Sequence, residues 1–227
     1  MSSASRDYRI LIVIPCYNAA GSLEELVQRI RVSVPGTDIL AIDDGSTDET
    51  SRVATDTGVT LLSFPDNRGK GAALRAGFKY ALASGYEAVV TIDSDLQHVP
   101  EEIPNFIEKF DGHSLLLGTR RIDPEVMPIG RCLSNNWTSM IVSVFSSRRV
   151  RDSQSGFRLI PCSILRTLNL ESDRYDMESE LLFKAGALSA PVGEVPIATV
   201  YRNSTSHISP FRDTGRFIRQ TWKRIWM

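Results

Sequence analysis

The chain has 227 residues, a net charge of -1, and contains 42% apolar and 23% charged residues. This composition is that of a folded globular protein; it excludes disordered and fibrous classes, and the near-neutral charge gives no reason to expect nucleic acid as a partner. Cys16, Cys132 and Cys162 form no CxxC pair, which argues against a disulfide framework or a zinc site and for a reducing cytoplasm. The length suits a single α/β domain, residues 1–227.

Short apolar runs alternate with segments of helical spacing in the first half of the chain. We expect strands buried on both faces at residues 9–14, where Pro15 stops the run, and at 39–42, 60–64, 88–92 and 114–117. One apolar face, Leu23 to Ile30, predicts a helix, and a second helix follows Gly71. This alternation predicts βαβ units and a mostly parallel central sheet flanked by helices. After residue 121 a loop precedes helical spacing at 137–145.

Polar clusters follow the first four of these predicted strands. They are PCYN at 15–18, DDGSTDE at 43–49, NRGKGAA at 67–73 and DSDLQ at 93–97. Ligands of open α/β sheets bind beyond the carboxyl ends of the strands, so we expect the four clusters to meet at one edge of the sheet.

The DSDLQ cluster suggests a metal site. On an extended backbone, Asp93 and Asp95 would leave the same face, and Gln97 continues the series. Two carboxylates and an amide oxygen suit Mg²⁺ or Mn²⁺ with phosphate oxygens completing the shell. The alternative is that these aspartates only cap the following turn.

The other clusters also have two interpretations. Asp43 and Asp44 could accept hydrogen bonds from a base or a ribose, while Ser46 or Thr47 caps the next helix. NRGKGAA lacks the spacing of an ATP-binding P-loop, although Arg68 and Lys70 beside glycines suit a phosphate or a ribose.

Together these motifs resemble a known family. The ordered set VIPCYN, DDGSTDE, NRGKGAALRAGF, DSDLQ, GTRR, DSQSGFRLI, MESELLFKAG, EVPIATVYR and STSHIS is similar to family 2 glycosyltransferases of the GT-A fold, most closely the dolichyl-phosphate mannosyltransferase and polyprenyl-phosphate glycosyltransferase branch. The resemblance covers roughly residues 10–210. It implies one Rossmann-like domain in which about 9–121 bind the nucleotide sugar and metal, about 122–210 form the acceptor half and 211–227 are a basic amphipathic tail.

The resemblance also implies roles for individual residues. Residues expected to contact the nucleotide sugar are Pro15, Tyr17, Asn18, Asp43, Asp44, Lys70 and Asp93. Metal ligands would be Asp93, Asp95 and Gln97, and catalytic residues Asp95, Arg120, Arg131 and Arg202, while Ser155–Arg158 (SGFR) would line the acceptor side. Two positions depart from the pattern, because Asn18 stands where many mannosyltransferases have Glu and His207 replaces a common Lys.

The implied reaction is metal-dependent, inverting transfer of a hexose from a nucleotide diphosphate sugar, GDP-mannose or a UDP-hexose, to a polyprenyl phosphate. A phosphate acceptor is already anionic and needs no base, whereas arginines must hold two repelling phosphates together. One alternative is a hydroxyl acceptor on a soluble or cell-surface glycan, with Asp152 or Asp176 as base. Another is a non-catalytic scaffold.

Membrane contact is expected to be peripheral. No apolar run approaches the roughly 18 residues of a spanning helix. Two stretches could meet a lipid, the segment 137–145 and the tail 211–227, which mixes Trp222 and Trp226 with Arg219, Lys223 and Arg224. We therefore expect a cytoplasmic protein that contacts the inner face of the membrane.

Overall fold

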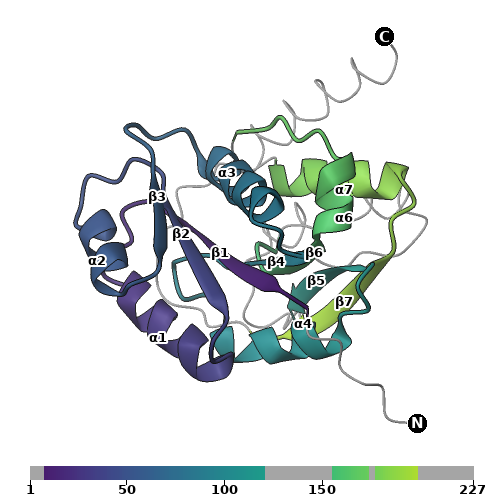
Figure 1. The fold of residues 1–227 in the computed structure, drawn as a ribbon, viewed down its shortest axis with the longest axis horizontal. Coiled ribbons are helices and arrows are strands. Elements are labelled where there is room, and N and C mark those ends of the chain that lie inside the picture. The colour runs from purple at the N-terminus through teal and green to yellow at the C-terminus, as the bar shows by residue number, and fades with distance from the viewer. Residues whose placement is uncertain (1–7, 121–154, 174–176, 199–227) are drawn as a thin grey trace, which may run out of the picture.

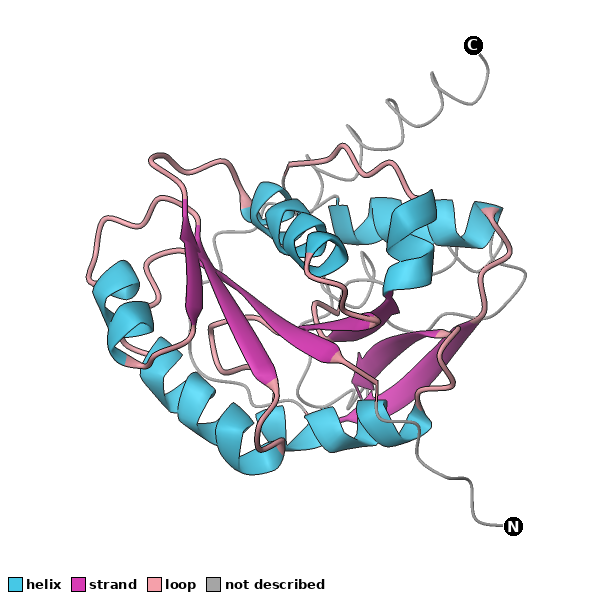
Figure 2. Cartoon of the chain, viewed as in Figure 1, coloured by secondary structure: helices cyan, strands magenta, loops and turns pink. Residues whose placement is uncertain are grey.

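A computed structural model describes residues 8–120, 155–173 and 177–198 of the chain. Helices and strands alternate through residues 8–120, as Figures 1 and 2 show. The elements are β1 (Ile10–Cys16), α1 (Leu23–Ser33), β2 (Asp38–Asp43), α2 (Thr50–Asp56), β3 (Thr60–Ser63), α3 (Lys70–Ala83), β4 (Ala88–Thr91), the 3₁₀ turn η1 (Pro100–Glu102), α4 (Ile103–Lys109), β5 (Leu115–Arg120), β6 (Arg158–Pro161), α6 (Cys162–Thr167), α7 (Met177–Ala187) and β7 (Val192–Ile197).

The strands form one mixed sheet in the order β3-β2-β1-β4-β6-β5-β7. The pairs β1–β2, β1–β4, β2–β3 and β5–β7 are parallel, and β6 runs antiparallel between β4 and β5. The predicted mostly parallel sheet with flanking helices is therefore confirmed. β6 comes from the second half of the chain, and its insertion brings the SGFR segment beside the end of β4.

The core lies on the two faces of this sheet. Alternate strand residues such as Ile12 and Ile14 pack with helices α1 and α4 on one face, whereas Leu11 and Val13 pack with α3, α6 and α7 on the other. Figure 1 shows these two helical layers with the sheet between them. Both faces of the central strands are covered, which explains their continuous apolar sequences.

The prediction that Pro15 stops the first strand is wrong, because β1 continues through it to Cys16. The oxygen of Cys16 accepts from Asp44 N on the β2 side, so Pro15, one residue earlier, faces β4. Pairing with β4 ends at Val13 and Thr91. Pro15 has no backbone N–H, but an N–H at this position would face β4 beyond the end of that strand. The proline therefore removes no hydrogen bond between strands.

Fewer helices and strands of the second half of the chain are predicted from the sequence. The predicted helix at 137–145 lies outside the described residues, and β6, α6, α7 and β7 were not placed by periodicity. Across residues 8–120, 155–173 and 177–198, the structure contains no helix with the length and apolar character to cross a membrane.

Candidate active site

The loops after β1 and β2 are joined to each other at the carboxyl edge of the sheet. Asn18, at a φ of 51°, donates its N–H to Ser46 Oγ at 2.9 Å, and its Oδ1 accepts from Thr47 N at 2.9 Å. Ala19 N donates to Thr50 Oγ1 at 2.7 Å. Asn18 therefore joins the two loops by hydrogen bonds from its backbone and to its side chain. This structural role could not be inferred from the presence of Asn where many mannosyltransferases have Glu.

The predicted capping of the helix by Ser46 or Thr47 is wrong. Helix α2 begins at Thr50, and Glu49 at the cap position makes no side-chain cap hydrogen bond. Asp48 instead accepts from Thr50 N at 3.0 Å. The Ser46 hydroxyl and the Thr47 N–H are hydrogen-bonded to Asn18. The contact between the two loops therefore replaces the helix cap that the local sequence predicts.

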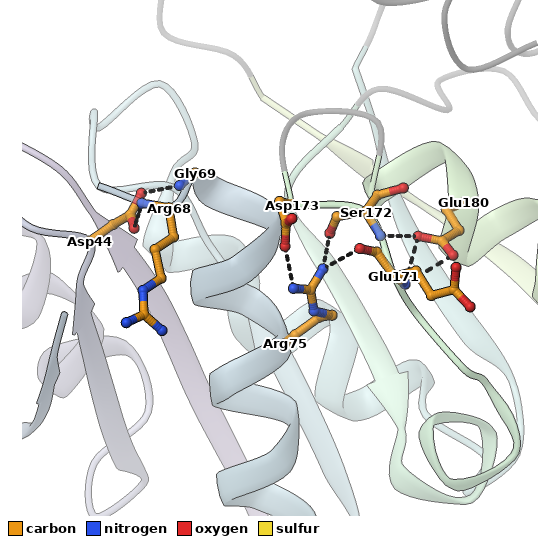
Figure 3. Close-up of polar contacts among 8 residues, drawn as sticks. All are labelled: Asp44, Arg68, Gly69, Arg75, Glu171, Ser172, Asp173 and Glu180. Carbon is orange, nitrogen blue, oxygen red and sulfur yellow. Dashed lines mark hydrogen bonds and ion pairs between the residues drawn. The ribbon is translucent and has the colours of Figure 1, made fainter. Parts of the chain in front are cut away.

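Asp43 and Asp44 are buried and accept hydrogen bonds from the protein. Asp43 Oδ1 accepts from Ser46 N at 2.9 Å and Oδ2 accepts from the Ser51 hydroxyl. Asp44 accepts from Arg68 N and Gly69 N, both at 2.8 Å (Figure 3). These carboxylates fix the loops around the edge of the sheet. Their contact with a nucleotide remains a prediction.

The DDG glycine is required by close packing. Gly45 has a φ of 69°, and a Cβ there would lie 2.4 Å from the backbone carbon of Asp66. Only glycine lets the loop after β2 approach the loop that leads to α3. Tyr17, in the loop after β1, is 50% exposed. Its ring is thus available beside the edge, whereas Pro15 is part of the buried strand β1.

A charged cluster lies where β4 ends. Lys70, the first residue of α3, places its Nζ 2.6 Å from Asp93 Oδ1 and 2.6 Å from Glu178 Oε1. Burial raises the pKa of Asp93, but Lys70, His98 and Arg158 outweigh burial and the net pKa is lowered. Burial likewise opposes the charge of Lys70, yet Asp93 and Glu178 raise the pKa of its ammonium overall. Asp93 and Lys70 are therefore both charged near neutral pH.

The backbone at DSD differs from the prediction. Ser94 and Asp95 form a turn, and Leu96 has a φ of 60°, so the extended geometry assumed for the two aspartates is wrong. Asp95 is exposed, and its Oδ1 accepts from Gln97 N at 3.0 Å. The turn presents Asp95 to solvent while Asp93 faces the Lys70 ammonium.

The donor set on this turn has the chemistry of a divalent-cation site. Two carboxylates and an amide oxygen lie on five successive residues; Asp95 is exposed, and Asp93 stays ionised against a cationic partner. Within the part of the chain that the structure describes, no three His, Cys, Asp or Glu side chains come together to hold a metal. The oxygens of Asp93, Asp95 and Gln97 are of the kind that a divalent ion takes together with phosphate oxygens and water, and their assignment as its ligands remains a prediction.

The SGFR segment packs directly on Asp93. A Cβ at Gly156 would lie 2.6 Å from Asp93 Oδ2, and Thr91 Oγ1 donates to Gly156 O at 2.7 Å. Arg158, almost fully buried, donates to Ser155 O and to Glu178 O, both at 2.7 Å. The resemblance implied that SGFR lines the acceptor side. In the structure this segment packs against the Asp93 carboxylate and hydrogen-bonds to Thr91, so it connects the first and second halves of the chain.

Arg120 and His98 lie near the charged cluster of Lys70 and Asp93. Arg120 is the last residue of β5, and His98 is buried with its ring 5.4 Å from that of Phe157. Burial lowers the pKa of His98, as do the charges of Lys70 and Arg120, against the opposing effect of Asp93 and Asp95. His98 is therefore neutral near pH 7. Arg120 is close enough to this cluster for its charge to act there.

Several predicted residues lie outside the described part of the chain. They are Arg131, Arg202, the alternative bases Asp152 and Asp176, the departure His207, and the tail 211–227. The structure brings together Lys70, Asp93, Asp95 and Gln97 at one edge, with Arg120 acting on the same cluster.

Glu178 and His98 were missed as members of this site. The signal for Glu178 was present, since it lies three, four and seven residues before Leu181, Leu182 and Ala185 on one buried helical face. A carboxylate in a core position needs a partner, and that partner is Lys70. Sequence spacing could not identify it, because Lys70 lies 108 residues away.

A family comparison agrees with this geometry. The profile of glycosyl transferase family 2 matches residues 11–168, which contain every described residue of the charged edge except Glu178. The chain belongs to this family. It is a family 2 glycosyltransferase, as the resemblance implied.

Relatives of this glycosyltransferase are named as sugar transferases. The chain is 32% identical to an undecaprenyl-phosphate mannosyltransferase of Micrococcus luteus, over 86% of this chain and 84% of that one. It is 30% identical to a UDP-N-acetylglucosamine–dolichyl-phosphate N-acetylglucosaminyltransferase of Methanococcus voltae, over 86% and 87%. The fold resembles that of glucosyl-3-phosphoglycerate synthase from Mycobacterium tuberculosis in complex with Mn²⁺ and UDP-glucose, with a TM-score of 0.70, 24% identity, and coverage of 95% and 77%.

Proposed function

We propose that this glycosyltransferase moves a hexose from a nucleotide diphosphate sugar to a polyprenyl phosphate, with inversion at the anomeric carbon and dependence on Mg²⁺ or Mn²⁺. The observation that carries the proposal is the turn after β4, where Asp95 is exposed and Asp93 is ion-paired with Lys70. The names of the relatives support a lipid phosphate as the acceptor. The donor is proposed to be GDP-mannose or a UDP-hexose.

Asp93, Asp95 and Gln97 would hold the divalent ion, which supplies charge neutralisation to the departing diphosphate. Asp95 is the member best placed for this role, because it is exposed at the edge. The backbone N–H of Gln97 donates to Asp95 Oδ1 at 3.0 Å, which holds the Asp95 carboxylate against the turn. The loops fixed by Asp43 and Asp44 and the ring of Tyr17 would bind the nucleoside part of the donor.

The acceptor side must bring two anions together. A phosphate monoester is ionised near neutral pH and attacks the anomeric carbon without losing a proton to the enzyme. Arg120, at the end of β5, is proposed to hold phosphate by charge-assisted hydrogen bonds. Arg131 and Arg202 are proposed for the same purpose from the resemblance alone. No general base is needed in this reaction.

A hydroxyl acceptor would need such a base. Glu178 shares the Lys70 ammonium with Asp93, but its Oε1 already accepts from that ammonium at 2.6 Å. An oxygen already bound to a cation is a weak proton acceptor. This ion pair argues against Glu178 as that base, whereas the candidate bases Asp152 and Asp176 lie outside the described residues.

The test is transfer by the purified full chain to a short-chain polyprenyl phosphate. Radiolabelled GDP-mannose, UDP-glucose and UDP-N-acetylglucosamine would each be supplied with Mn²⁺, with Mg²⁺ or with a chelator. We expect a lipid-soluble labelled product from one donor, only with metal, and the opposite anomeric configuration in the product. The matching free polyprenol serves as the control acceptor. Equal transfer to the polyprenol, or full activity with the chelator, would contradict the proposal.

A further inference from the structure

We propose that Glu178 is a positioning residue for the metal-binding turn, acting through Lys70 on Asp93. The inference rests on the proposed function, because it assumes that the DSDLQ turn holds the divalent ion. It assigns a role to a residue on α7 for which neither the resemblance nor the relatives supply one.

The ion pairs carry the first step. The Lys70 ammonium lies 2.6 Å from an oxygen of each carboxylate, and the side chains of Lys70, Asp93 and Glu178 are 17%, 25% and 10% exposed. Water screens such contacts poorly, so the two carboxylates compete for one ammonium. The contact with Glu178 therefore weakens the interaction of the Lys70 ammonium with Asp93.

The position of Glu178 is fixed from two sides. Its carbonyl oxygen accepts from Arg158 Nη1 at 2.7 Å, while the same guanidinium donates through Nε to Ser155 O. Gly156, next to Ser155, packs on the Asp93 carboxylate. Arg158 thus links the backbone of Glu178 to the segment behind Asp93, and Lys70 links the two side chains. Asp93 and Glu178 are therefore held in a defined relation to each other.

The consequence concerns charge at the metal-binding turn. Lys70 with two carboxylates leaves a net charge of one negative unit, which favours a divalent cation. Removing the charge of Glu178 would leave the trio neutral and would direct the ammonium wholly to Asp93. Both effects oppose a metal ion at Asp93, so Glu178→Gln should weaken metal binding. Removing the ammonium in Lys70→Met should instead strengthen metal binding.

A second buried carboxylate on the same helix provides a matched control. Glu180 pairs with Lys184 at 2.6 Å and accepts from the N–H groups of Glu171 and Ser172 (Figure 3). It holds α7 to the preceding segment without contacting Lys70 or Asp93 in any described interaction. Glu180→Gln therefore tests whether a general loosening of α7 is enough to change metal binding.

The experiment measures Mn²⁺ affinity directly, from the loss of the electron paramagnetic resonance signal of free Mn²⁺ on titration with each full-length protein. It is run without nucleotide and again with UDP and with GDP. Asp95→Asn checks that the titrated site is the DSDLQ turn. We expect Glu178→Gln to raise the dissociation constant roughly tenfold, Lys70→Met to lower it, and Glu180→Gln to leave it unchanged.

Each outcome decides the matter. An unchanged affinity in Glu178→Gln, or an equal loss in Glu180→Gln, would overturn the positioning role while leaving the metal site of the proposed function intact. Wild-type protein that binds no Mn²⁺ under any condition would overturn the metal site and this inference together. If Glu178→Gln does not fold, Lys70→Met and Glu178→Asp supply the test, and weaker binding in Lys70→Met would refute the inference.

Discussion

The carboxylate of Asp93 lies where a side chain at position 156 would begin. A Cβ on Gly156 would meet Asp93 Oδ2 at 2.6 Å and Oδ1 at 2.9 Å. Backbone from the second half of the chain is therefore in contact with the first aspartate of the DSD motif. The glycine of SGFR is required by this approach rather than by an unusual backbone angle, since no positive φ is found there.

Gly156→Ala should accordingly displace Asp93. The added methyl group forces the carboxylate or the β6 segment to move, which we expect to cost roughly 1–3 kcal/mol of unfolding free energy and to lower transfer strongly. Urea denaturation and initial rates measure the two effects. Gly21→Ala is the matched control, because a Cβ there meets nothing within 4 Å. Normal rates in Gly156→Ala would show that the position of Asp93 does not matter for transfer.

Asp95→Ala should abolish transfer without unfolding the protein. Asp95 is exposed, and the hydrogen bond it accepts from Gln97 N is local, so the unfolding free energy should change by only about 0.5 kcal/mol. We expect the rate to fall by about a hundredfold or more, since the group lost would act on charge that develops during the reaction. Melting curves and rates in excess Mn²⁺ check this. The exposed Asp56→Ala on α2 is the control, and activity within a few fold of wild type in Asp95→Ala would remove the metal assignment.

Arg120→Ala should lower kcat by a factor on the order of a hundred, because a guanidinium that holds phosphate acts by position and charge. Arg120→Lys should recover only part of the rate, as an ammonium cannot make two parallel hydrogen bonds. Rates at saturating donor with varied polyprenyl phosphate measure both variants. Arg166→Ala, at the end of α6, is the control for loss of a positive charge. A normal kcat in Arg120→Ala would contradict the phosphate role.

Glu180 gives a prediction about pH. Burial raises the pKa of Glu180, but Lys184 and the N–H groups of Ser172 and Glu171 outweigh burial, and the net pKa lies below the ordinary value of 4.5. The folded state therefore binds this proton less readily than the unfolded state, so the stabilisation is present above pH 4.5 and is lost as the pH falls through the folded pKa. Glu180→Gln should be less stable than wild type at neutral pH.

The difference in unfolding free energy between wild type and Glu180→Gln should then shrink in acid. Urea denaturation of both proteins at neutral pH and at a series of lower values measures it. Glu171→Gln, an exposed change in the same segment, serves as the comparison. A difference that stays constant down to the lowest pH would show that Glu180 has no lowered pKa.

The tail 211–227 lies outside the described residues, and its role follows from sequence alone. It sets Trp222 beside Arg219, Lys223 and Arg224. Basic residues near an anionic leaflet contribute about 1 kcal/mol each, so the full chain should cosediment with anionic liposomes, and less so at high salt. Reversal of the three basic charges should abolish this binding, whereas Lys79→Glu on α3 should not. Equal binding of all proteins to neutral liposomes would contradict the electrostatic contact.

Periodicity and strand-end chemistry in the sequence predict the first five strands of the sheet and the polar edge, but not β6 and β7. The family follows from the resemblance of the ordered motifs. Continuous apolar runs predict strands covered on both faces, and parallel strands place their carboxyl ends at one edge, so PCYN, DDGSTDE and DSDLQ had to be neighbours. The first strand was wrong only at its end, because Pro15 faces a side on which the neighbouring strand has already stopped. These features depend on interactions between residues close in sequence or on general rules of sheet geometry.

Tertiary structure alone decided which partner each charged or polar group found. Asn18 hydrogen-bonds to Ser46 and Thr47, whose side chains were expected to cap α2. Asp44 accepts from the N–H groups of Arg68 and Gly69, and Lys70 joins Asp93 to Glu178. Each of these contacts joins residues between 23 and 108 positions apart. A hydrogen bond or ion pair depends on atoms meeting within about 3 Å, and that meeting is set by how helices and loops pack on the sheet, which no local pattern encodes.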